Sequence, residues 1–190
     1  MSIRKSIFSG LICLMIALGS RAQQMPENKH LWREQPLQWE DFQGTPEAGN
    51  PFHANTSSGL SYGWSLKTSI AGSELDYKVE SFFNPDLSWV KPGSESLHLL
   101  AHEQLHFDIT ELHARKLRAA MEKFDVGKVK DVKQTLKSLY QKIEAERREM
   151  QERFDAETKH SQEEEMQMEW QEFIEAELAK LSEFSSAKSS

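Results

Sequence analysis

Cysteine is nearly absent from this 190-residue chain, and the single one, Cys13, lies close to the N-terminus. A lone cysteine forms no disulfide within its own chain, so packing, together with any bound metal, has to stabilise the fold. Basic residues are in the minority, with 23 Lys and Arg against 30 Asp and Glu and a net charge of −7. This balance argues against nucleic acid and anionic membranes as partners.

The chain also lacks a long hydrophobic run. Its most apolar stretch, residues 7–18, is too short to span a bilayer comfortably. Two basic residues precede it and a small-x-small sequence ending at Ala22 follows, which predicts a signal peptide over residues 1–22. We therefore expect an exported protein, periplasmic or extracellular, with no membrane span after cleavage. Removing the signal takes away three basic residues and leaves 20 against 30 acidic ones, a charge of −10.

The front half of the mature chain has the pattern of strands and turns. Leu60, Tyr62, Trp64 and Leu66 alternate with polar or small residues, a period of two with one apolar face. A second alternating run, residues 75–79, follows Ala71-Gly72-Ser73, which reads as a hairpin turn. This half is therefore predicted to form a small, mostly antiparallel sheet.

The back half is predicted to be helical. Ser94 or Ser96 can cap a first helix that runs to about Phe124. Apolar residues at steps of three and four over 129–150 and 166–178 predict further helices. The fold class is thus α+β and zincin-like in outline, with the sheet packed against the first, long helix and the other helices behind it. Residues 23–181 are predicted to form a single metallohydrolase domain, and residues 182–190 a disordered tail.

The first of these helices contains His102-Glu103-Gln104-Leu105-His106, the H-E-x-x-H motif. Histidines four residues apart on a helix differ by about 40° in azimuth and about 6 Å in height, so both can reach one metal ion. Glu103 lies about 100° from His102, close enough to hold a metal-bound water without being a ligand. The motif predicts Zn2+ bound by His102 and His106, with Glu103 as the catalytic carboxylate. The alternative for these residues is a helix with solvated histidines.

A catalytic zinc usually has three protein ligands, and the helix itself is a poor source of the third. His98 would make three ligands in a straight line, which tetrahedral geometry disfavours. His113 lies about 10 Å along the axis from His106. The metzincin pattern is absent, because Ile109 and Leu112 stand where it needs glycine and histidine.

The third ligand is therefore expected from a remote segment. His160 is the leading candidate, and a solvated surface histidine is its alternative reading. Glu157 or Asp155 is chemically acceptable as well. His30 and His53, in the irregular front half, are weaker candidates.

The sequence resembles a family of exported bacterial proteins of formally unknown function that are predicted to be secreted zinc-dependent proteases. Similar proteins pair H-E-Q-G-H-F-D with a downstream Y-D-x-x-T-x-H-G. The resemblance implies His102, His106 and His160 as metal ligands and Glu103 as the catalytic residue. Its elements in this chain are Leu37-x-Trp39-x-Asp41-Phe42-x-Gly44-x-Pro46, Ser88-Trp89-Val90, residues 102–109 and Asp155-x-Glu157-Thr158-x-His160.

Three positions depart from the family pattern. Leu105 replaces a small residue between the histidines, Phe154 replaces a tyrosine and Ser161 replaces a glycine. Loss of the tyrosine hydroxyl would weaken catalysis if that group takes part in it. Loss of the glycine would weaken the third ligand if the glycine sets the loop that aims His160.

These observations predict an exported zinc-dependent hydrolase, a metallopeptidase that uses a metal-activated water, a glutamate general base and a peptide or protein substrate. The main alternative is a catalytically silent, metal-stabilised binding module, which the three departures motivate. A third interpretation is a helical interaction protein that uses the apolar stripe over 129–178. The sequence determines neither substrate specificity nor oligomeric state.

Overall fold

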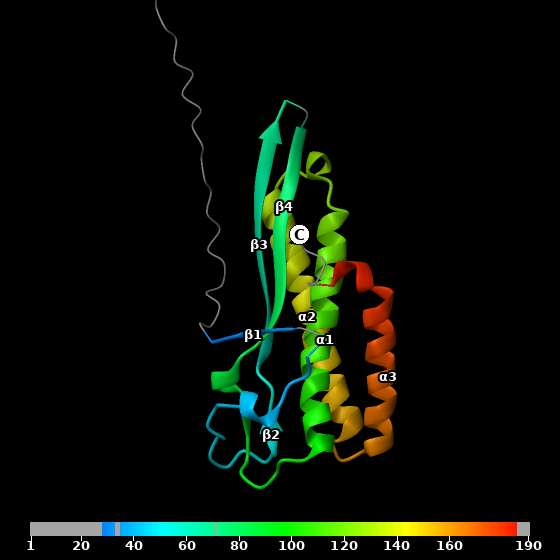
Figure 1. The fold of residues 1–190 in the computed structure, drawn as a ribbon. Helices are drawn as coiled ribbons and strands as arrows, with labels where there is room; N and C mark the ends of the chain where they lie inside the picture. The colour runs from blue at the N-terminus through cyan, green and yellow to red at the C-terminus, as the bar shows by residue number, and fades with distance from the viewer. Residues whose placement is uncertain (1–27, 33–34, 71, 186–190) are drawn as a thin grey trace, which may run out of the picture.

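The computed structural model describes residues 28–32, 35–70 and 72–185, so the predicted signal peptide lies outside the described residues. The fold is α+β, as predicted (Figure 1). A three-stranded antiparallel sheet has the strand order β1 (His30–Leu31), β4 (Gly72–Phe83) and β3 (Ser58–Ser69). A separate antiparallel pair joins β2 (Ala54–Asn55) to β5 (Trp89–Val90). The helices are α1 (Leu97–Glu122), α2 (Val132–Thr158) and α3 (Glu164–Lys180).

The long β3–β4 hairpin forms where the alternating pattern predicts it. The register pairs Ser58 with Phe83 at one end and Ser69 with Gly72 at the other, where Gly72 has φ 132°. Leu60 is buried, and Tyr62 and Trp64 pack against the same hydrophobic cluster, because residues two apart share a face of the strand. Leu66, nearer the tip, is 40% exposed and leaves the core.

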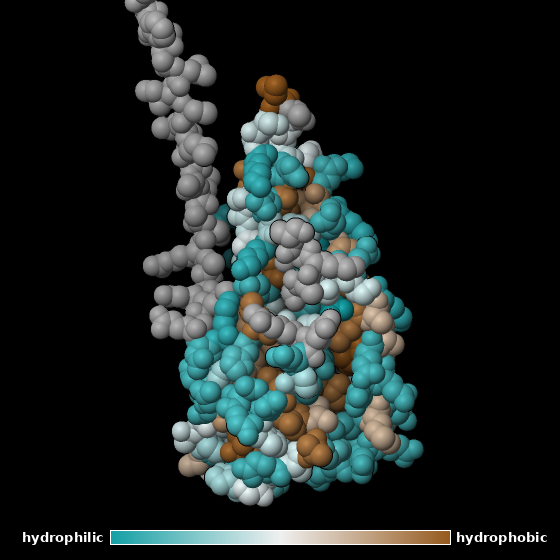
Figure 2. All heavy atoms as spheres, viewed as in Figure 1, coloured by the Kyte–Doolittle hydropathy of each residue, from teal (hydrophilic) through white to brown (hydrophobic). Residues whose placement is uncertain are grey.

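Helix α1 is the central element of the molecule. It packs against the hairpin and against both other helices (Figure 1). Ser96 is its N-cap, one of the two serines that the sequence offers, and the Ser96 hydroxyl accepts a hydrogen bond from the backbone N–H of Leu99. One core cluster fills the space between the hairpin, α1 and α2, and a second lies among the three helices around Phe154 and Trp170. Hydrophilic side chains cover most of the face in Figure 2, and hydrophobic residues are visible at the hairpin tip, in the middle of this face and near its lower end.

The chain remains ordered beyond the predicted end of the domain. Ser182–Phe184 form a short 3-10 helix, η4, and the Arg118 Nη1 group of α1 donates to the Phe184 carbonyl at 2.8 Å. Of the predicted disordered tail, residues 182–185 are described, and the buried Arg118 guanidinium binds their backbone; residues 186–190 lie outside the described residues. Among the described residues, no helix is long and apolar enough to cross a membrane.

Candidate metal centre

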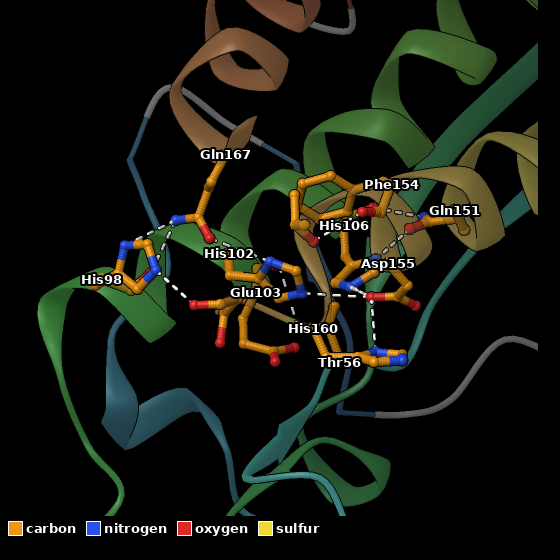
Figure 3. A network of polar contacts seen from close by, with 12 residues as sticks. Thr56, His98, His102, Glu103, His106, Gln151, Phe154, Asp155, His160 and Gln167 are labelled. Atoms are coloured by element: carbon orange, nitrogen blue, oxygen red, sulfur yellow. Dashed lines mark hydrogen bonds and ion pairs between the residues drawn. The ribbon is translucent and has the colours of Figure 1, made fainter. Parts of the chain in front are cut away.

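The H-E-x-x-H residues lie in the first half of α1, on the wall of a cleft. The His102 and His106 rings are neighbours, with centroids 4.9 Å apart, as their four-residue spacing on a helix requires. Both side chains face α2, which runs beside α1 (Figure 3). The four-residue spacing on one helix therefore brings the two imidazoles together, as the motif predicts.

Asp155 of α2 completes a group of three. Its Oδ1 lies 3.3 Å from the Nε2 of His102 and 3.1 Å from the Nε2 of His106. The ligand atoms of the three side chains all lie within 4.8 Å of one another, so this group could hold a metal ion. Two imidazole nitrogens and a carboxylate oxygen form a donor set that suits zinc. From the sequence, Asp155 is only an acceptable alternative, because the resemblance implies His160 as the third ligand.

His160 reaches the same cleft but is not a member of this group. Its Nδ1 lies 3.4 Å from the Asp155 Oδ1, and its side chain is 45% exposed. The ring packs on Phe52 with centroids 4.3 Å apart. The structure thus places His160 beside the group that could hold a metal ion, in contact with Asp155, and leaves its role as a ligand a prediction.

The other candidate ligands have different partners. The Glu157 carboxylate accepts a hydrogen bond from the Trp170 indole, His30 lies beside Asp41, and the His53 ring contacts the Ser94 hydroxyl. His98 contacts the Ser161 carbonyl through Nε2, and the buried His113 contacts the Ile109 carbonyl through Nδ1. None of these five belongs to the group around Asp155.

Glu103 is buried, at 3% exposure, on the same wall of the cleft. Its Oε2 has no hydrogen-bond partner within the part of the chain that the structure describes. A buried carboxylate oxygen without a partner is costly, and this one lies where a water, an ion or a reacting group could reach it. The Thr56 hydroxyl donates to the Glu103 backbone carbonyl at 3.2 Å, which ties this turn of α1 to the segment before β3.

The cleft has a volume of about 450 Å³. It lies between the segment around β2 and the facing sides of α1 and α2. Its lining comprises residues 51–56 and 58, then Leu99, His102, Glu103 and His106, then Arg147, Arg148, Gln151, Glu152 and Asp155, and finally His160 and Gln162. This volume lies within the range of small-molecule and cofactor sites.

A metal ion binds a deprotonated carboxylate and neutral imidazoles. The pKa shifts favour these states at Asp155 and His102 and oppose them at His106. Burial would raise the pKa of Asp155, but hydrogen bonds from His102 and His106 outweigh burial and hold that pKa well below its usual range. Burial lowers the pKa of His102, which favours the neutral imidazole that binds metal. The pKa of His106 is raised, because Asp155 and Glu103 outweigh the effect of its burial. His106 therefore holds its second proton more tightly than His102 does, and a metal ion has to displace that proton in order to bind.

The three departures from the family pattern have distinct places in the structure. The Phe154 ring stacks on the His102 imidazole at 4.5 Å and meets the His106 ring edge-on at 5.0 Å, so it forms an apolar wall without a hydroxyl. Leu105 is buried in the cluster among the helices. Ser161 adopts φ 68° and follows two further left-handed residues.

A comparison with known protein families gives a match to part of the chain. A family model described as "Bacterial protein of unknown function (DUF922)" matches residues 95–161. This stretch contains the H-E-x-x-H helix, all of α2 and the segment that carries Asp155 and His160. Comparisons with curated proteins and with solved structures found no match.

Proposed function

We propose that this protein is an exported zinc-dependent hydrolase, a peptidase that acts on a peptide or protein substrate. The observation that carries the proposal is the arrangement of four side chains on one cleft. The ligand atoms of His102, His106 and Asp155 lie within 4.8 Å of one another. Glu103 contributes to the same wall a buried carboxylate oxygen that has no hydrogen-bond partner among the described residues. The predicted signal peptide supports a location outside the cytoplasm.

The donor set defines the role of each side chain. His102, His106 and Asp155 would hold the zinc ion, with His160 as a further candidate at the edge of the site. When bound, zinc lowers the pKa of a water molecule to about 7 and polarises a carbonyl group. Glu103 accepts the proton of the attacking water at its carboxylate and passes it to the leaving amine. The Phe154 ring shields the inner side of both imidazoles from water.

A metal-stabilised binding module is the second candidate. Phe154 favours it, because a ring without a hydroxyl lies directly against both imidazoles where the resembled family has tyrosine. A hydroxyl there could donate a hydrogen bond to a developing oxyanion, and phenylalanine cannot. In such a module the metal would stabilise the packing of α1 against α2, and Glu103 would have no chemical task.

Glu103→Gln separates the two candidates. The substitution preserves shape and removes the proton acceptor, so the peptidase should keep its zinc and its fold and lose about 10²- to 10⁴-fold in turnover. Zinc content is measured by elemental analysis and turnover with peptide libraries. Glu149→Gln, an exposed change on α2, is the matched control and should leave both unchanged. Zinc-loaded wild type without turnover on broad libraries would support the binding module instead.

A further inference from the structure

A glutamine side chain meets each of the paired imidazoles on the side away from Asp155 (Figure 3). The Oε1 of Gln167, on α3, lies 3.2 Å from the Nδ1 of His102. The Oε1 of Gln151, on α2, is hydrogen-bonded to the Nδ1 of His106. Neither glutamine belongs to a recognised motif, and Gln167 lies beyond the segment that the family model matches.

Backbone carbonyls determine which way the two carboxamides face. The Gln167 Nε2 donates to the His98 carbonyl at 3.0 Å, and the Gln151 Nε2 donates to the His106 carbonyl at 2.8 Å. A carbonyl oxygen can only accept, so the NH₂ group of each glutamine must face it and the Oε1 must face the imidazole. Each imidazole therefore donates from a protonated Nδ1.

In the neutral form of each imidazole, this hydrogen bonding leaves the Nε2 atom as the electron-pair donor. The two Nε2 atoms face the Asp155 Oδ1 at 3.3 Å and 3.1 Å. Three electron-pair donors at such distances repel one another unless a proton or a cation lies among them. Without metal, an Nε2–H group can donate to Asp155, and a bound cation takes the place of that proton. Hydrogen bonding at one ring nitrogen sets which nitrogen of a histidine binds metal.

We infer that Gln151 and Gln167 are positioning residues of the proposed metal centre, each holding one imidazole in the Nδ1–H form with Nε2 toward the ion. This inference rests on the proposed function. It gives α3 a role in the site, although the three ligands of the group come from α1 and α2.

The surroundings of Gln167 fit this role. The side chain is 4% exposed, and a buried amide is unfavourable unless its hydrogen-bonding groups are satisfied. Its Nε2 also contacts the Nδ1 of His98 at 3.4 Å, and the Nε2 of His98 lies 2.7 Å from the Ser161 carbonyl. The same network thus connects His102 to the turn that carries His160.

Near-isosteric substitution tests the inference. Gln167→Met and Gln151→Met remove the acceptor and keep the side-chain length, so each should weaken zinc binding about 10- to 100-fold, the usual effect of losing such a partner. Affinity is measured by competition with a chromogenic chelator. Gln171→Met on α3 and Gln141→Met on α2 change exposed glutamines and should bind zinc as wild type does. Equal affinity in all four variants would overturn the inference.

A nuclear magnetic resonance readout distinguishes positioning from packing. The zinc-loaded wild type should show two exchange-protected imidazole Nδ1–H protons, and Gln167→Met should lose only that of His102. Gln167→Glu, which retains an acceptor, should restore part of the lost affinity and also serves if the methionine variant does not fold. Two protected protons in Gln167→Met would contradict the inference while leaving the metal centre intact. A wild type that binds no zinc would overturn both the inference and the proposed function.

Discussion

Asp155 and His160 both lie near the His102 and His106 imidazoles, and both are candidates for the third ligand of the proposed metal centre. The Asp155 Oδ1 is the common partner of His102, His106 and His160, at 3.3, 3.1 and 3.4 Å. His160 is half-exposed and follows the helix that fixes Asp155. A ligand held by a helix loses less conformational freedom on binding than one held by the turn after it. Geometry therefore favours Asp155, whereas the family resemblance favours His160.

Alanine substitution decides between them. Asp155→Ala should reduce zinc affinity more than about 100-fold, the upper end for a residue that acts only through a ligand, and His160→Ala by about 10-fold or less. Chelator competition measures both values. Asp76→Ala, an exposed change on the hairpin, should have no effect. If His160→Ala has the larger effect, the ligand set is the one that the resemblance implies.

Individual residues differ in how far the sequence predicts them. His102, Glu103 and His106 lie on one helix, so helical geometry alone fixes their mutual positions. Asp155 lies about 50 residues away, and only the packing of α1 against α2 brings it to them. Gln151 and Gln167 belong to no recognised sequence motif. Their roles depend on which helix faces meet, and this cannot be read from local periodicity.

At the scale of elements, the alternating strand pattern and the capped helix were predictable because both are local. The hairpin register follows from its short turn, and Ser96 begins α1 by capping it. The order of strands in the sheet, with β1 paired to β4, and the ordered η4 depend on contacts between distant segments. These features therefore appear only in the structure.

The turn after α2 is the most strained element of the described chain. Lys159, His160 and Ser161 have φ values of 48°, 53° and 68°, a left-handed conformation that costs non-glycine residues about 1–2 kcal/mol each. Hydrogen bonds offset this strain, including one from the His160 N–H to the Asp155 carbonyl at 2.9 Å. His160, in the middle of this turn, lines the cleft.

Ser161→Gly should stabilise the protein by about 0.5–1 kcal/mol. Glycine adopts positive φ without the steric penalty, and its greater freedom in the unfolded chain removes part of the gain. The Ser161 carbonyl that contacts His98 is retained. Denaturant unfolding gives the value, and Ser138→Gly, an exposed change inside α2, should destabilise by about 0.5 kcal/mol. Equal destabilisation by both substitutions would show that the turn is not strained.

At the scale of the whole molecule, the proposed centre links elements that are distant in sequence. The ligands come from α1 and α2, α3 contributes Gln167, and Thr56 attaches the strand side of the cleft to α1. The one cysteine lies within the predicted signal peptide, so no disulfide within the mature chain can link these elements. A metal ion between α1 and α2 would therefore stabilise the tertiary structure as well as supply chemistry.

Zinc should accordingly raise the melting temperature of the mature protein. A ligand at about 100 times its dissociation constant stabilises the folded state by about 2.7 kcal/mol. For a domain of this size each kcal/mol shifts the melting temperature by about 2–4 °C, so zinc should add about 5–10 °C relative to protein treated with a chelator. Differential scanning calorimetry measures the shift. In the His102→Ala, His106→Ala double variant the shift should vanish, because Asp155 alone cannot hold the ion against the chelator. A shift of the same size in the double variant would place zinc elsewhere on the protein, and the helix pair would then have no metal to join it.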